Sequence, residues 1–162
     1  MTMTERLLHH NLWATRVLLD RCRLLTAEQF MQRHDIGPGS LHDTLRHIVG
    51  AMFRWADRLA GRTVRDSIER NPRPQTPDEL LTLLDRAARE LEEVVTRIDR
   101  ESRHDEKMRT EFPGEPFTRG TAVVHVVTHG VHHRAQALNM LRRLGVADLP
   151  ELDAISWERQ TT

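Results

Sequence analysis

Histidine is the residue type whose distribution along this chain most clearly suggests chemistry. Ten of the 162 residues are histidine. Four of these lie within nine consecutive residues, at His125, His129, His132 and His133. Imidazole is the commonest metal ligand among protein side chains. Metal binding is therefore the first chemistry that the sequence suggests.

The spacing within this cluster separates two inner histidines from two outer ones. On a helical wheel, at about 100° per residue, His129 and His133 border the apolar side of the segment, whereas His125 and His132 lie farther out. That apolar side consists of Val123, Val126, Leu138, Leu141 and Leu144. Residues four positions apart on a helix point the same way, one turn apart, and can hold one metal ion. His129 and His133 are therefore the better candidate ligands.

A third ligand is expected from another element, because two histidines seldom make a specific metal site. His47 lies between Leu45 and Ile48, near the edge of a second apolar stripe. A helix bundle could bring it against His129 and His133. Three neutral imidazoles suit Zn²⁺, Ni²⁺, Fe²⁺ or Cu²⁺, and ligand type alone does not choose among them. Periodicity alone also leaves open that these histidines are solvated or only structural.

The elements that must position these side chains are predicted to be helices. In four long segments, apolar residues recur at helical spacing rather than in the strict alternation of a strand. These helices are expected over residues 4–25, 41–61, 77–100 and 118–145. Short helical turns are expected at residues 26–29 and around Trp157, and the polar stretch 102–118 is expected to be irregular, with room for a small hairpin. The prediction is an all-α four-helix bundle with short additional helical turns, forming one domain over residues 1–162.

Local signals place several helix ends. Thr76 followed by Pro77 and two acidic residues predicts a capped start at Pro77. Ser40 with Asp43 three residues later is a weaker capping signal. Gly145 is a natural residue to follow the end of the last long helix.

Composition limits the class of protein and its partners. Lys plus Arg and Asp plus Glu balance at 24 each, so no overall field favours nucleic acid or an anionic membrane. Cys22 is the single cysteine, which excludes an internal disulfide and suits a reducing compartment. No secretory signal pattern and no apolar run of membrane-spanning length are visible. We therefore expect a soluble, cytoplasmic protein that binds neither membrane nor nucleic acid.

The histidine-rich segment resembles a known family signature. The string HGVHHRAQ at residues 129–136, preceded by His125, resembles the HxxHHRGQ signature of the DinB family, with Ala135 where the family usually has glycine. Alanine is small and favours helix, so the backbone is expected to be undisturbed. Further similarity lies in NLWA at 11–14, LRHI at 45–48 and LPELD at 149–153. The resemblance spans nearly the whole chain and implies a metal-binding four-helix bundle.

Carried over by position, the resemblance implies that His47, His129 and His133 are the metal ligands. Zn or Ni is the expected ion, with Fe, Mn or Cu as alternatives. His125 and His132 would then be neighbours of the site, either solvated or hydrogen-bonded to a ligand. The resemblance also implies a homodimer. Arg134 falls among apolar positions on the wheel, so a buried ion pair or an interface contact is expected for it.

Two classes of function follow. Three protein ligands leave a coordination position for water or substrate, which is the layout of a catalytic site. Members of the DinB superfamily include transferases and isomerases that use bacillithiol, mycothiol or glutathione. By resemblance, the first hypothesis is a metal-dependent thiol S-transferase or hydrolase acting on a small electrophilic molecule. The alternative is a non-catalytic, metal-binding stress-response protein.

The remaining notable residues have structural interpretations. Trp13, Trp55 and Trp157 are expected to lie in the core, because large aromatic side chains at helical spacing are usually buried. Cys22 is expected to pack as a small apolar side chain. The charged stretch 86–103 is typical of a solvated helix face.

Overall fold

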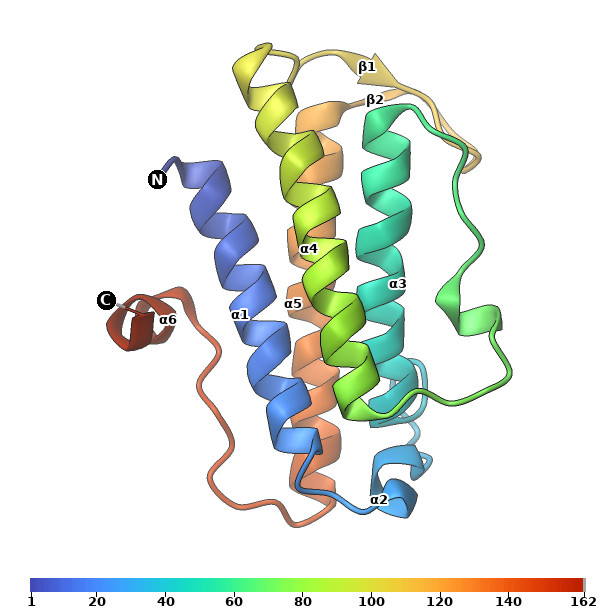
Figure 1. Cartoon of the computed structure of the whole chain (residues 1–162), viewed down its shortest axis with the longest axis vertical. Helices are drawn as coiled ribbons and strands as arrows, with labels where there is room; N and C mark the ends of the chain where they lie inside the picture. The colour runs from blue at the N-terminus through green and yellow to red at the C-terminus, as the bar shows by residue number, and fades with distance from the viewer. Residues whose placement is uncertain (162) are drawn as a thin grey trace.

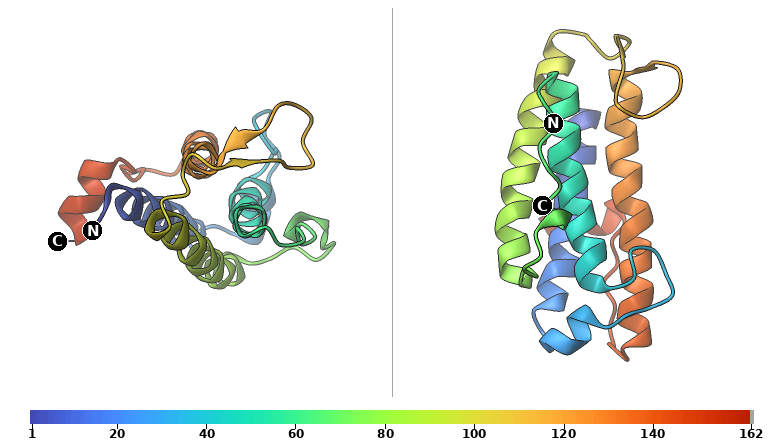
Figure 2. Two further views of the ribbon diagram at one scale, coloured as in Figure 1. Left: turned by 90° about the horizontal axis from the view of Figure 1, so that it is seen from above. Right: turned by 90° about the vertical axis from the view of Figure 1, so that its right-hand side faces the viewer.

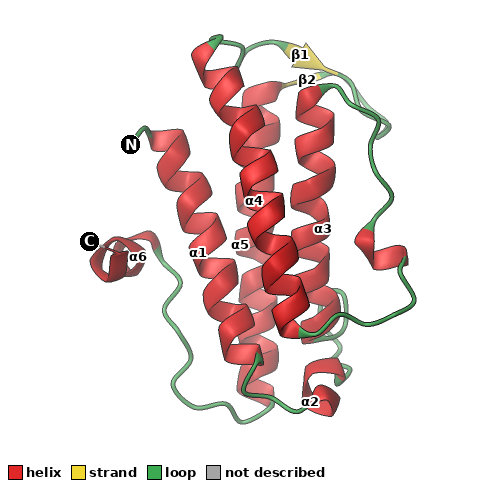
Figure 3. Ribbon diagram, in the orientation of Figure 1, coloured by secondary structure: helices red, strands yellow, loops and turns green. Residues whose placement is uncertain are grey.

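The computed structural model describes residues 1–161 and is built on four long helices (Figures 1 and 3). The long helices are α1 (Met3–Cys22), α3 (Leu41–Ala60), α4 (Pro77–Arg100) and α5 (Arg119–Arg143). The shorter elements are α2 (Ala27–Met31), the 3-10 turn η1 (Ile68–Arg70), α6 (Ala154–Thr161) and the strands β1 (Lys107–Met108) and β2 (Phe117–Thr118). The predicted helical class is confirmed.

The four long helices form a bundle in which α1 and α3 each pack against both α4 and α5. Seen from above, α1 and α3 therefore occupy opposite corners, as do α4 and α5 (Figure 2, left). In Figure 1, α1 and α5 run downward and α3 and α4 run upward. Because α3 and α4 are parallel, residues 61–76 must return along the length of the bundle to connect them. This long connection carries η1.

Capping chemistry explains where several helices begin and end. The Thr76 hydroxyl accepts a bond from the Glu79 amide, and the Glu79 side chain accepts one from the Thr76 amide, so α4 begins at Pro77 as predicted. The Ser40 hydroxyl accepts a bond from the Asp43 amide and so caps α3. The Asp43 carboxylate does not return this bond but accepts one from Arg33. The left-handed backbone of Gly145, with φ of 77°, follows the end of α5 as expected.

Helix α1 ends three residues earlier than the sequence predicts. It stops at Cys22, and the exposed Leu24 lies in the turn that follows. The physical reason is the next cap: Thr26 adopts an extended backbone and accepts a bond from the Gln29 amide to start α2. The chain must leave the α1 axis before that residue.

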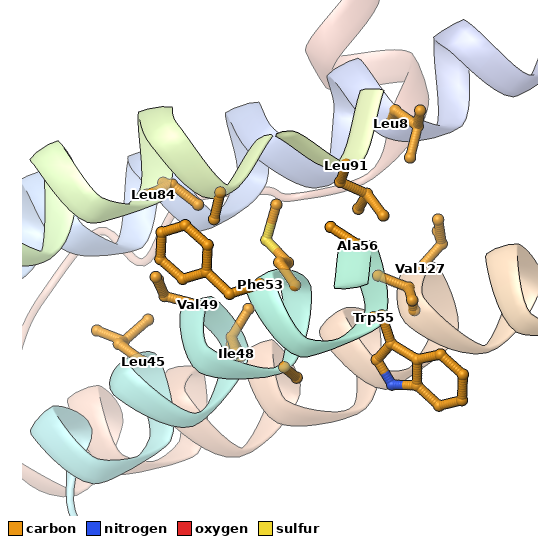
Figure 4. Packing of buried hydrophobic residues seen from close by; sticks show 14 of the residues in the cluster. Leu8, Leu45, Ile48, Val49, Phe53, Trp55, Ala56, Leu84, Leu91 and Val127 are labelled. Carbon is orange, nitrogen blue, oxygen red and sulfur yellow. The ribbon is translucent and has the colours of Figure 1, made fainter. Parts of the chain in front are cut away.

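Apolar side chains from all four long helices fill the centre of the bundle. Leu18, Leu45, Leu84 and Leu141 are completely buried, and each such side chain contributes on the order of 1.5–3 kcal/mol. Figure 4 shows Leu84 and Leu91 of α4 facing Leu45 and Val49 of α3 across this core. In the same view, Trp55 extends to the side of α3 away from the two α4 leucines.

The predictions for the smaller apolar and aromatic residues are mostly confirmed. Cys22 is buried, and this burial raises its thiol pKa to about 12, so it packs as an apolar group. Trp55 and Trp157 are buried, whereas Trp13 is only half-buried beside the ring of His10. In the charged stretch 86–103, Arg86 and Glu90 form an ion pair at 2.9 Å.

The remaining short elements lie at one end and along one side of the bundle (Figure 1). Strands β1 and β2 pair antiparallel, with Lys107 opposite Thr118, so the irregular stretch does contain a small hairpin. The chain after α5 returns along the bundle, and α6 packs against α1 (Figure 1). Within residues 1–161, no helix has the length and apolar character needed to cross a bilayer.

Candidate metal centre

Helices α3 and α5 bring His47, His129 and His133 together. One ring nitrogen of each residue lies within 4.8 Å of the other two, and all three side chains are half-buried. The Nε2 atoms of His47 and His129 are 3.0 Å apart, and the ring centres of His129 and His133 are 4.4 Å apart. The i,i+4 pair predicted from the wheel therefore faces the third histidine across the α3–α5 contact.

The tautomer of His47 is set by Glu69, which comes from η1. The Nδ1 atom of His47 lies 2.7 Å from Glu69 Oε1. Bonding to His47 lowers the pKa of Glu69, so this carboxylate is ionised at neutral pH and can only accept a hydrogen bond. Nδ1 of His47 therefore carries the proton, and its Nε2 presents a lone pair toward the other two histidines.

The tautomer of His133 is set in the same way by Gln136. His133 Nδ1 donates to Gln136 Oε1 at 2.8 Å, and the Gln136 amide nitrogen donates to His132 Nε2 at 3.0 Å. The Nε2 atom of His133 is then free to act as a ligand. A ligating histidine usually donates its other ring N–H to an oxygen in this manner. His132 thus contacts the site indirectly, through Gln136.

The donor set fits a divalent transition metal ion. With metal–nitrogen bonds of about 2.1 Å, nitrogens in a tetrahedral shell are roughly 3.4 Å apart, similar to the spacing between His47 and His129. Desolvation, followed by the neighbouring His133 and His47, lowers the pKa of His129 to about 3. Desolvation also lowers the pKa of His133. Both rings are neutral at neutral pH, which is the form that binds a metal.

Two arginine side chains of α3 hold the connection that carries Glu69. Arg46 donates from Nε to the carbonyl oxygen of Ile68 at 3.0 Å, and Arg54 bonds to Ser67 and lies 3.8 Å from Glu69. Gly50 allows the close approach, since a Cβ atom there would lie 3.2 Å from Ile68. The position of Glu69 therefore depends on long-range contacts.

The outer histidines lie where the wheel predicted. His125 and His132 are exposed, whereas His129 and His133 are half-buried. The ring of His125 lies 5.7 Å from that of His129 and 5.0 Å from that of Trp55. His132 therefore supports the site through Gln136, and His125 extends the line of rings toward Trp55.

Arg134 is buried, but an ion pair is not what holds it there. Its side chain donates to Asn11 Oδ1 at 2.6 Å and to Thr15 Oγ1 at 3.1 Å, between α5 and α1. Within residues 1–161, no carboxylate lies within salt-bridge distance of it. Gly130 provides the space, because a Cβ atom there would lie 2.4 Å from Asn11 Oδ1. The expected acidic partner is thus replaced by neutral oxygens.

Sequence reasoning missed Glu69 and gave no role to Gln136. Gln136 could have been found, because it follows His133 by three residues on one helix and closes the family-like string. Glu69 carries no such signal, since it lies 22 residues from His47 in an irregular connection.

Comparisons with known proteins agree with this fold. The chain is 23% identical over 151 residues to protein DinB of Bacillus subtilis (strain 168), covering 90% of this chain and 88% of that protein. The crystal structure of a DinB-like protein from Bacillus cereus ATCC 10987 superposes with a TM-score of 0.68 at 20% identity, over 88% of this chain and 91% of that one. A second DinB-like structure, YjoA from B. subtilis, superposes with a TM-score of 0.63 at 15% identity, over 91% of this chain and 97% of that one. The model of the DinB family matches residues 1–160, and the chain therefore belongs to the DinB family.

Proposed function

We propose that this chain is a metal-dependent enzyme that uses His47, His129 and His133 as ligands and transfers a thiol to a small electrophilic molecule. The observation that carries the proposal is the open side of the histidine group. Within residues 1–161, no fourth histidine, cysteine or carboxylate joins the three. Three ligands with an open position are typical of catalytic rather than structural sites.

The residues of the site have distinct roles in this proposal. His47 and His133 are held by Glu69 and Gln136 with Nε2 directed inward, so little reorganisation accompanies binding. An ion bound there supplies a Lewis acid that lowers the pKa of a thiol or a water molecule. Thiol transfer and hydrolysis are therefore two reactions of one site, and we place thiol transfer first.

Several finer expectations remain predictions. Zn or Ni is the expected ion, and Fe, Mn or Cu would suit the same ligands. The expected cosubstrate is a low-molecular-weight thiol. The homodimer and the cytoplasmic location inferred from the sequence are proposed in the same way.

Metal content is the measurement that tests the proposal first. Protein purified without an affinity tag or added metal is analysed by mass spectrometry beside the double variant His47→Ala/His129→Ala. A His9→Ala variant is the matched control, because it removes a histidine of α1 that pairs with Glu92 and takes no part in the three-histidine group. We expect about one ion per chain in the wild type and the control and none in the double variant. Metal-free protein that cannot bind Zn²⁺ or Ni²⁺ would rule the proposal out.

Activity is then measured on metal-loaded protein. Conjugation of glutathione, bacillithiol or mycothiol to a chromogenic electrophile is followed with and without the double substitution. Transfer that requires the histidines would support the enzyme. A loaded protein with neither transfer nor hydrolysis would favour the non-catalytic, metal-binding alternative.

A further inference from the structure

A cavity of about 400 Å³ lies beside the histidine group, at the hairpin end of the bundle. Its walls come from α3, the segment 109–117 and the first two turns of α5. The lining residues are Trp55, Phe112, Phe117, Thr121 and His125. The volume falls in the range of about 300–1,000 Å³ that is usual for small-molecule sites.

Aromatic rings make up most of this cavity. The ring centre of Trp55 lies 6.2 Å from those of both Phe112 and Phe117, and 5.0 Å from that of His125. Phe112 is 51% exposed. The exposed ring leaves one wall of the cavity accessible from solvent.

The cavity has no free charge. Arg58 lies above the rings of Trp55 and Phe112, but its guanidinium is bonded to Glu111. The Thr121 hydroxyl is bonded to Thr118. Within residues 1–161, neither ring nitrogen of His125 has a hydrogen-bond partner. One unengaged polar group in an aromatic cavity favours an uncharged ligand with a single hydrogen-bonding atom.

The cavity adjoins the proposed metal ligands directly. His125 lies four residues, about 6 Å along the helix axis, before His129 on α5. Its ring is 5.7 Å from that of His129 on one side and 5.0 Å from that of Trp55 on the other. A molecule bound between the aromatic rings could therefore extend past His125 to the three histidines.

We propose that this cavity binds the uncharged aromatic part of the small-molecule substrate, with His125 as a positioning residue that bonds its polar atom. The reaction at the histidine group rests on the function proposed above, whereas binding in the cavity does not. Stacking against Trp55 and Phe112 supplies the affinity, and the absence of free charge disfavours ionic ligands.

Binding is tested on metal-free protein with N-phenyl-1-naphthylamine, an uncharged aromatic probe that fluoresces in apolar sites. Two variants alter the cavity: Phe112→Ala removes a wall, and Thr121→Phe fills the space from an exposed position on α5. Met31→Ala is the control, because it removes an apolar side chain that lines a separate cavity of about 480 Å³ near Cys22. Circular dichroism checks that each variant is folded.

We expect the probe to bind the wild type and Met31→Ala equally, and each cavity variant roughly five- to tenfold more weakly. The double variant His47→Ala/His129→Ala should bind the probe as the wild type does, which separates this proposal from the proposed function. The sulfonated analogue 8-anilinonaphthalene-1-sulfonate should bind more weakly than the uncharged probe. No binding, or equal loss in Met31→Ala, would overturn the proposal.

Discussion

Two polar clusters occupy different faces of α5, and they are built in contrasting ways. The face toward α3 carries His129 and His133, which are half-buried and belong with His47 to the group of ring nitrogens that could hold a metal ion. The face toward α1 carries Arg134, which is 3% exposed and bonded to Asn11 and Thr15. Residues of a single eight-residue string thus belong to both clusters.

The contrast shows that one string carries both histidines that could hold a metal ion and an arginine that packs against α1. Burial lowers the pKa of Arg134 to about 10, so the guanidinium stays charged at neutral pH and needs its oxygen partners. Burial lowers the pKa of His129 to about 3, so its ring stays neutral and able to bind a metal. Gly130 lies between His129 and Arg134 in the string and provides the space that the buried cluster of Arg134, Asn11 and Thr15 requires. We call this cluster the sealed cluster. We expect the sealed face, which carries Arg134, to govern stability, and the open face, which carries His129 and His133, to govern binding.

The largest effect is expected from Arg134→Ala, which breaks the sealed cluster. The substitution leaves a cavity and deprives the fully buried Asn11 of its charged donor, so we expect a loss of about 3 kcal/mol in the free energy of unfolding. Urea denaturation of metal-free protein measures it. His132→Ala, which removes an exposed ring from the same string, should change stability by less than about 0.5 kcal/mol. Similar losses in both variants would mean that the two faces do not divide these roles.

Glu69→Ala alters the open face without removing a ligand. Loss of the carboxylate frees Nδ1 of His47, so we expect metal affinity to fall roughly ten- to a hundredfold. Competition titration with a chelating dye measures the affinity. Asp66→Ala is the matched control, because it removes an exposed carboxylate from the same connection. Equal affinity in Glu69→Ala and the wild type would show that the tautomer of His47 is set in another way.

The smallest effect on metal binding is expected from Asp57→Asn, in the last turn of α3 before the connection that carries Glu69. Asp57 is 4% exposed and accepts two bonds from the Arg65 guanidinium, at 2.7 and 2.8 Å. These bonds hold its pKa below the usual value. The stabilisation is therefore fully present above about pH 4 and is lost as the pH falls through the folded-state pKa.

We expect Asp57→Asn to lower the free energy of unfolding by roughly 2 kcal/mol at pH 7 and by less below pH 4. Urea denaturation across this pH range provides the test. A difference from the wild type that stays constant with pH would exclude ionisation of Asp57 as its source. Metal affinity at pH 7 should change little, because Arg46 and Arg54 still hold the connection.

The sequence by itself determined the features that depend on neighbours along the chain. Helical periodicity predicted the four long helices, and the cap at Thr76 placed the start of α4. The same periodicity separated the inner from the outer histidines, because exposure on a helix follows the angle around its axis. His47 was a candidate from its place at the edge of an apolar stripe, but one such histidine has no distinctive local signal, and the family resemblance was what implied it as a ligand.

Only the tertiary structure decided the features that depend on residues far apart in the chain. The parallel course of α3 and α4 sends residues 61–76 along the bundle and so brings Glu69 to His47. The aromatic cavity likewise joins Trp55 to side chains more than fifty residues later. The oxygens around Arg134 come from a helix at the other end of the sequence. Such contacts are set by helix direction and packing, which a one-dimensional pattern of apolar residues does not encode.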